Sequence, residues 1–95
     1  MITLQQAQRI ISELGNEFDS NDFIEKYMSL FERDYVNALV EKIECNHIFR
    51  TVNASIGRFL TDNQKELRIA KNERKTSNNV KGNDSENQGW IKTML

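Results

Sequence analysis

The chain has no proline, and among its 95 residues there are only one cysteine, one histidine and four glycines. Without proline, no helix is interrupted by a residue that lacks a backbone N–H. The single thiol, Cys45, cannot form an intrachain disulfide, so folding relies on non-covalent packing. This cysteine usage is typical of a reducing compartment, and we expect a cytoplasmic protein.

Several functional classes lack the residues that they need. Cys45 and His47 have no further cysteine or histidine with which to complete a zinc site, and nothing near them marks a nucleophilic pair. There is no glycine-rich phosphate-binding motif. Residues 1–4 do not begin a signal peptide, and no apolar run approaches the roughly 20 residues that span a bilayer. We expect a non-enzymatic protein without cofactor, metal or membrane segment.

The charges are divided unequally between the two halves of the chain. Residues 1–49 carry four Lys or Arg against nine Asp or Glu, a net of −5, whereas residues 50–95 carry nine against five, a net of +4. A basic half favours an anionic partner. The alternative is that the two halves simply attract each other, and charge alone does not decide between these readings. The length predicts a single domain, residues 1–95, with a modest core.

The first half of the chain has helical periodicity. Residues 3–14 carry an apolar stripe, preceded by a capping box from Thr3 and Gln6 and followed by Gly15 as a stop. Residues 22–44 keep the same spacing of apolar side chains. They form either one long helix or two with a break within 29–34, and two are favoured because 23 residues is long for a small domain.

The second half predicts one more helix and then a hairpin. The helix covers residues 48–62, and an alternating segment and a final apolar run predict two strands within residues 67–94. The polar segment 73–87 between them is either a disordered loop or a functional one, since long loops are often functional. The predicted fold is mostly α with a small C-terminal β-hairpin.

This order of helices followed by a hairpin with a basic tip resembles the winged helix-turn-helix superfamily. The resemblance covers most of the chain and rests on element order and patterning, without a diagnostic motif. In that family a recognition helix enters the major groove of DNA and the wing contacts the backbone. The resemblance implies a recognition helix at about 51–62, a wing at about 67–92, and function as a DNA-binding regulator or accessory factor.

Candidate DNA contacts lie opposite the apolar stripe of the third helical region and on the wing. Arg and Asn side chains can make bidentate contacts with guanine and adenine, and cations and small polar groups can hold phosphates. The alternative is that these side chains are ordinary solvated surface residues. The candidates for contact are Arg50, Asn53, Ser55, Arg58, Lys71, Arg74 and Lys75. Glu25, Glu32 and Glu41 should then face away from this surface, because phosphates repel carboxylates.

Phe23, Tyr27, Phe31 and Tyr35 form an aromatic row, which is either core or an exposed seam. An exposed row would form an isologous dimer seam or a groove for a partner. The aromatic row and the small core together favour a homodimer over a monomer. The rival function is a protein-interaction module that uses this row or the acidic N-terminal half. The predicted shared core comprises Leu4, Ile10, Ile11, Leu14, Phe23, Tyr27, Leu39, Val52, Ile56, Phe59, Leu60, Ile69 and Trp90.

Overall fold

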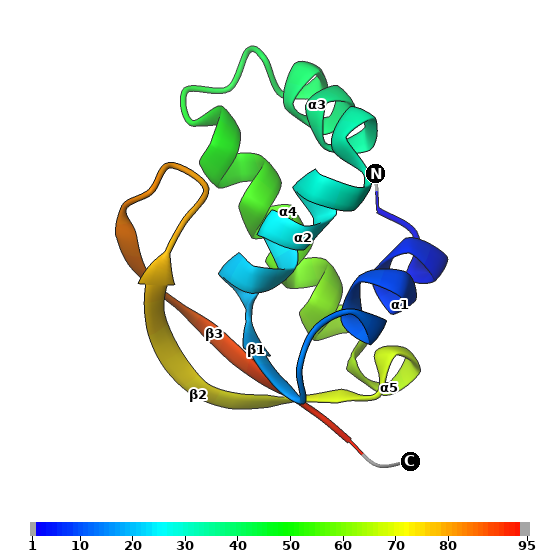
Figure 1. Ribbon diagram of the computed structural model, residues 1–95. Helices are drawn as coiled ribbons and strands as arrows, with labels where there is room; N and C mark the ends of the chain where they lie inside the picture. The colour runs from blue at the N-terminus through cyan, green and yellow to red at the C-terminus, as the bar shows by residue number, and fades with distance from the viewer. Residues whose placement is uncertain (1, 94–95) are drawn as a thin grey trace.

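The computed structural model describes residues 2–93, which form five helices and a three-stranded antiparallel sheet (Figure 1). The fold is therefore mixed α/β, with more strand than the sequence predicted, and it includes the expected C-terminal hairpin. Residue 94, where the hairpin was predicted to end, lies outside the described residues. The elements are α1 (Leu4–Ser12), β1 (Glu17–Asp19), α2 (Ser20–Leu30), α3 (Glu32–Glu41), α4 (Ile48–Asp62), α5 (Gln64–Leu67), β2 (Ile69–Asn78) and β3 (Asp84–Lys92).

The first helix begins with the predicted capping box. The Thr3 side chain accepts a hydrogen bond from the Gln6 backbone, and the Gln6 side chain accepts one from the Thr3 backbone. Ile2, just before the cap, is buried together with Ala7, and these are the two positions of a hydrophobic staple. Leu4 is 39% exposed, so its predicted place in the core is wrong. Ile2 is the residue before α1 that enters the core.

The second helical region is two helices, as favoured from its length. They meet at Phe31, whose backbone (φ −131°, ψ 51°) leaves the helical region. Its N–H bonds the Tyr27 carbonyl to close α2, and its carbonyl accepts the Tyr35 N–H to open α3. This single non-helical residue changes the direction of the chain, so α3 does not continue the axis of α2 (Figure 1).

The third helical region was predicted correctly as 48–62, but a further short helix, α5, follows it. Arg68 ends α5 in the left-handed conformation, with φ 56° and ψ 49°. That turn starts β2 at Ile69, two residues later than the predicted strand. No apolar stripe marks α5, which buries only Leu67.

The sheet has the order β1-β3-β2, so the C-terminal strand is central. Phe18 of the three-residue strand β1 lies opposite Trp90 of β3. The long polar loop predicted at 73–87 is wrong, because most of these residues belong to the two strands. Strand pairing continues to Asn78 opposite Asp84, and only residues 79–83 form the turn. Side chains that face the helices there are polar and bond one another, which is why no apolar alternation is present.

A register shift interrupts the hairpin between Asn72 and Lys75, where β2 has one residue more than β3. Gly89 lies opposite this β-bulge. A Cβ atom at Gly89 would lie 2.2 Å from the carbonyl oxygen of Glu73, so no other residue fits without moving the backbone. The bulge therefore requires glycine at this position.

The core lies between the helices and the sheet. Its largest fully buried side chains include Trp90, Tyr27 and Phe23. The aromatic row is internal rather than an exposed seam, because Phe23 and Tyr27 are 0% exposed, Tyr35 is 2% exposed and Phe31 is partly buried. The other predicted core residues are buried, except that Leu14, Leu39 and Phe59 are partly buried at its edge. No helix within residues 2–93 is long and apolar enough to cross a membrane.

Candidate nucleic-acid interface

One side of α4 and the hairpin enclose a groove of about 710 Å³, which the first turns of α2 also line. Arg50, Asn53 and Gly57 border it from α4, and Arg74 and Lys81 border it from the hairpin. Three of these five residues are cationic. Three of the nine Lys and Arg residues of the basic half therefore border one groove between α4 and the hairpin.

Two contacts limit how the groove cations can act. The Arg74 Nε lies 2.7 Å from Glu86 Oε1, and Arg74 Nη2 donates to the Glu86 carbonyl at 3.3 Å. Both side chains are more than half exposed, so this ion pair is screened and is readily exchanged for another anion. Lys81 Nζ lies 5.4 Å from the centre of the Phe49 ring, a cation–π contact between the turn and the start of α4.

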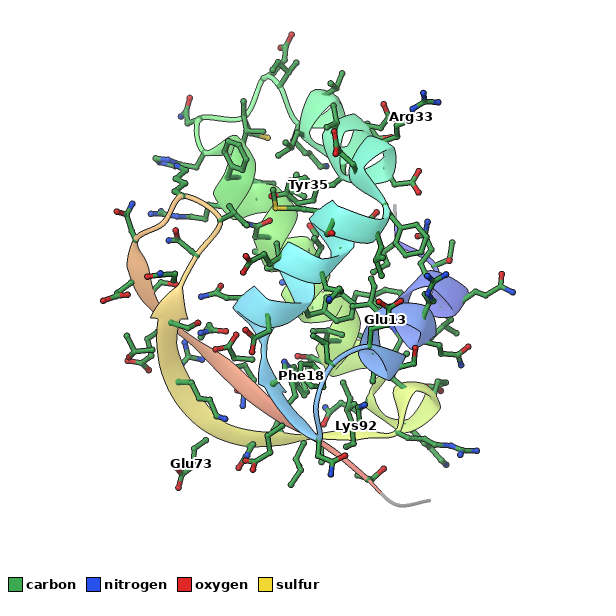
Figure 2. All side chains as sticks on the ribbon, in the orientation of Figure 1. Glu13, Phe18, Arg33, Tyr35, Glu73 and Lys92 are labelled. Carbon is green, nitrogen blue, oxygen red and sulfur yellow. The ribbon has the colours of Figure 1, made fainter. Side chains whose placement is uncertain are left out.

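Asn53 was predicted as a base-reading residue, and it is half-buried at the groove wall. Its Oδ1 accepts a hydrogen bond of 2.9 Å from the Tyr35 hydroxyl on α3. Burial raises the pKa of Tyr35, and the hydrogen bond to Asn53 lowers it by less. Figure 2 shows Tyr35 directed into the molecule from α3. The Asn53 oxygen thus has an internal partner, and its amide nitrogen is the group left for a ligand.

The four contact residues predicted on α4 are divided between two hollows, with Arg50 and Asn53 at the groove. Ser55 and Arg58 line a second hollow of about 390 Å³ on the other side of the helix, together with Ile2 and Asp62. The Ser55 hydroxyl donates a hydrogen bond of 3.0 Å to the Thr51 carbonyl of the same helix, so this donor is already used within the protein. Arg50 and Asn53 consequently face the hairpin, whereas Ser55 and Arg58 do not.

The crest between the two hollows is formed by small residues. Ala54 borders both hollows, and Gly57 borders the groove. A Cβ atom at Gly57 would have no heavy atom within 4 Å. Close approach of another helix therefore does not explain this glycine within residues 2–93, although glycine inside a helix costs roughly 1 kcal/mol relative to alanine.

Of the predicted hairpin cations, only Arg74 lines the groove. Lys71 is exposed and lies opposite Trp90 in the register. Lys75 is half-buried opposite Asn87, whose Nδ2 donates to the Lys75 carbonyl at 3.1 Å. Lys81 takes the place beside Arg74 that these two lysines were expected to fill.

A polar cluster, defined as Asn21, Ser77, Ser85 and Asn87, attaches the hairpin to α2. Asn21 Nδ2 lies 3.1 Å from Ser77 Oγ and 3.0 Å from Ser85 Oγ, and its backbone N–H donates to Asn87 Oδ1 at 2.9 Å. Asn87 also donates to Ser77 Oγ at 3.3 Å. Sequence reasoning missed this cluster, because Asn21 alone gives only a capping signal and its partners lie more than fifty residues away.

The three acidic residues expected away from the candidate surface line neither hollow beside α4. Glu25 borders a separate hollow between α2 and the segment that follows α1, and Glu32 and Glu41 are exposed on α3. The carboxylates that do line the hollows beside α4 are Asp62 and Glu86.

Comparison with protein families, with characterised proteins and with solved structures finds no match to this chain. The features of this chain that bear on its function are α4, the two hollows beside it and the hairpin.

Proposed function

We propose that this protein binds duplex DNA in the manner of a winged-helix protein, with α4 in the major groove and the hairpin against the backbone. The observation that carries the proposal is the exposed side of α4. Arg50, Ala54 and Arg58 follow one another at intervals of four residues, so they lie on successive turns of the helix. Arg50 borders the groove, Arg58 borders the second hollow, and Ala54 borders both. Both arginines are exposed.

The dimensions suit a duplex. The major groove is about 12 Å wide and an α-helix with its side chains is about 10–12 Å across, so a helix enters only if its flanks are clear. Here each flank of α4 is hollow. Ala54 and Gly57 present little side chain at the crest, which lets the helix backbone approach base edges. Arg50 and Arg58 are then spaced about 12 Å apart along the helix axis, within reach of bases or phosphates.

The element order supports the same proposal. A helical bundle is followed by an antiparallel hairpin that stands beside α4 (Figure 1), as the resemblance to winged helices implies. The polar cluster holds that hairpin on α2. Arg74 and Lys81 are thereby kept at a fixed distance from Arg50, and a positioned set of cations is what phosphate contacts require.

The first test is a salt titration of binding to random duplex DNA between about 50 and 200 mM salt. Each phosphate contact removed should reduce the slope of log affinity against log salt by about one, and we expect this for Lys81→Ala and Arg74→Ala. The matched control is Lys65→Ala, an exposed cation on α5 that lines neither hollow. Absence of binding at low salt would overturn the proposal in favour of a protein-interaction module that uses the acidic half.

Three further substitutions test α4 and the hairpin separately. Gly57→Ala adds a methyl group in open space, so it should leave the fold intact and still weaken binding. Glu86→Gln removes the anion that pairs with Arg74 and should strengthen binding. On a selected cognate site, Arg58→Ala should cost about 1–3 kcal/mol while hardly changing binding to random DNA. Unchanged affinity in Gly57→Ala and Arg58→Ala alike would exclude α4 as the reading helix.

A further inference from the structure

Two exposed valines lie on α3, and an exposed isoleucine follows the helix. Val36 is 47% exposed, Val40 is 59% exposed and Ile43, just beyond the helix, is 63% exposed. The side of α3 that faces the protein fully buries only Tyr35 and Ala38. Three of the six large apolar side chains exposed within residues 2–93 therefore belong to this one row, the α3 ridge, defined as Val36, Val40 and Ile43.

The spacing of the α3 ridge is that of a helix–helix seam. Val36 and Val40 are four residues apart on α3, which places their side chains above one another on one face. Ile43 follows in the turn just past the helix, where its N–H bonds the Val40 carbonyl at 3.1 Å. Single exposed apolar residues are ordinary on a protein surface, but a contiguous apolar row marks a contact site. Apolar side chains that stay in water do not stabilise a helix of ten residues through burial.

We propose that the α3 ridge pairs with the same ridge of a second copy, antiparallel and related by a two-fold axis near the middle of α3. The opposite charges at the two ends of the α3 ridge favour a second copy as the binding partner. Arg33 lies at the start of the row and Glu44 just past its end, and both are exposed. An antiparallel pair sets Val36 against the partner's Val40 and Arg33 close to the partner's Glu44, and symmetry forms each contact twice.

The internal contacts leave both charged groups available. Within residues 2–93 the ion pairs are Arg9–Glu13 and Arg74–Glu86, which involve neither Arg33 nor Glu44. Figure 2 shows Arg33 directed away from the body of the protein at the edge of α3. A parallel pair would instead place Arg33 beside the partner's Arg33, where like charges repel. The antiparallel arrangement also opposes the two helix dipoles.

The surface is separate from the proposed DNA-binding groove. No residue of α3 lines either hollow beside α4, so pairing through the ridge leaves both open. Because α3 is only about 15 Å long, the seam falls among small interfaces, below about 1,200 Å² of total buried area. Self-association should therefore depend on protein concentration. The proposal does not rest on DNA binding, and its test contains no nucleic acid.

Sedimentation equilibrium over about 1 μM to 1 mM protein tests the pairing. The unsubstituted protein should pass from monomer to dimer within this range. Val40→Glu should raise the dissociation constant more than about tenfold, because it places two carboxylates in an apolar seam. The matched control is Ile91→Glu, at a side chain 39% exposed on β3, which should leave self-association unchanged.

A charge exchange tests the antiparallel register. Arg33→Glu should weaken the dimer, and Arg33→Glu combined with Glu44→Arg should restore it. Both positions are exposed, so the variants remain folded, and circular dichroism verifies this. A monomer at the highest concentration, a dimer indifferent to Val40→Glu, or a double variant as weak as Arg33→Glu alone would each overturn the proposal.

Discussion

Trp90 Nε1 donates a hydrogen bond of 3.0 Å to the hydroxyl of Ser20, a residue 70 positions earlier in the chain. The indole is fully buried, and Ser20 is nearly so. The Ser20 hydroxyl also lies 3.4 Å from the Gln88 carbonyl, so one small side chain connects the start of α2 to the central strand. The largest side chain in the core thus has its only polar atom satisfied.

Ser20→Ala should destabilise the fold by about 1–3 kcal/mol, because it leaves the Trp90 N–H buried without a partner. Urea denaturation followed by the fluorescence of this single tryptophan measures the loss. Ser29→Ala is the control, since Ser29 is an exposed residue of the same helix. Equal midpoints for the two variants would show that the bond contributes nothing to stability.

The two glycines Gly89 and Gly57 should respond in opposite directions to alanine. Gly89→Ala forces a methyl group against the Glu73 carbonyl and should cost more than about 2 kcal/mol. Gly57→Ala fills open space inside α4 and should raise stability by about 0.5–1 kcal/mol. Thermal unfolding of both variants under one condition provides the comparison. A stable Gly89→Ala protein would mean that the bulge rearranges at little cost.

Tyr27 and Tyr35 are both buried, but only one hydroxyl has a partner. Within residues 2–93 the Tyr27 hydroxyl is buried without a hydrogen bond, whereas Tyr35 donates to Asn53. Tyr27→Phe should leave the free energy of unfolding unchanged or raise it by about 1 kcal/mol, and Tyr35→Phe should lower it by about 1 kcal/mol. Denaturant titrations of the two variants decide this. A larger loss for Tyr27→Phe would contradict the assignment.

Alkaline pH should destabilise the protein through the same residues. Burial, with the nearby Asp34 charge, raises the pKa of Tyr27, and burial raises the pKa of Tyr35. Below the unfolded value of about 10 both states hold the proton, so stability is at its full value. As the pH rises above about 10 the unfolded state ionises first, and stability falls until the folded pKa is passed.

The measurement is the urea midpoint between about pH 8 and pH 11. Tyr27→Phe should reduce the fall at alkaline pH, because one of the two tyrosines with a raised pKa is removed. Parallel curves for this variant and the unsubstituted protein would show that Tyr27 ionisation is not linked to unfolding.

The longer helices were largely predictable because their apolar side chains recur at helical spacing, whereas α5 buries only Leu67 and was missed. The stripe of α4, with Val52, Ile56 and Leu60 buried, gave the helix its correct bounds. The strands were less predictable, for two physical reasons. β1 is only three residues long and depends on pairing with β3, and the inward positions Ser77 and Asn87 are polar. Hydrogen bonds between distant side chains leave no periodic signal in the sequence.

The candidate site was predictable only in outline. A helical stripe shows which residues of α4 avoid the core, and Arg50 and Arg58 are indeed exposed. It cannot show which hollow each borders, because that depends on where the hairpin lies. The polar cluster and the contact between Lys81 and Phe49 fix that position, and both join segments far apart in the chain.

The central strand of the sheet, β3, follows every other described element in the chain, so β1 and β2 have no pairing partner until it is made. During translation, at about 5–20 residues per second, the helices leave the ribosome with the place of Trp90 still empty. A nascent chain stalled before Asp84 would display the apolar lining of that gap. Such a chain would be a substrate for chaperones or proteases, whereas one that has released residues 84–92 can close its core.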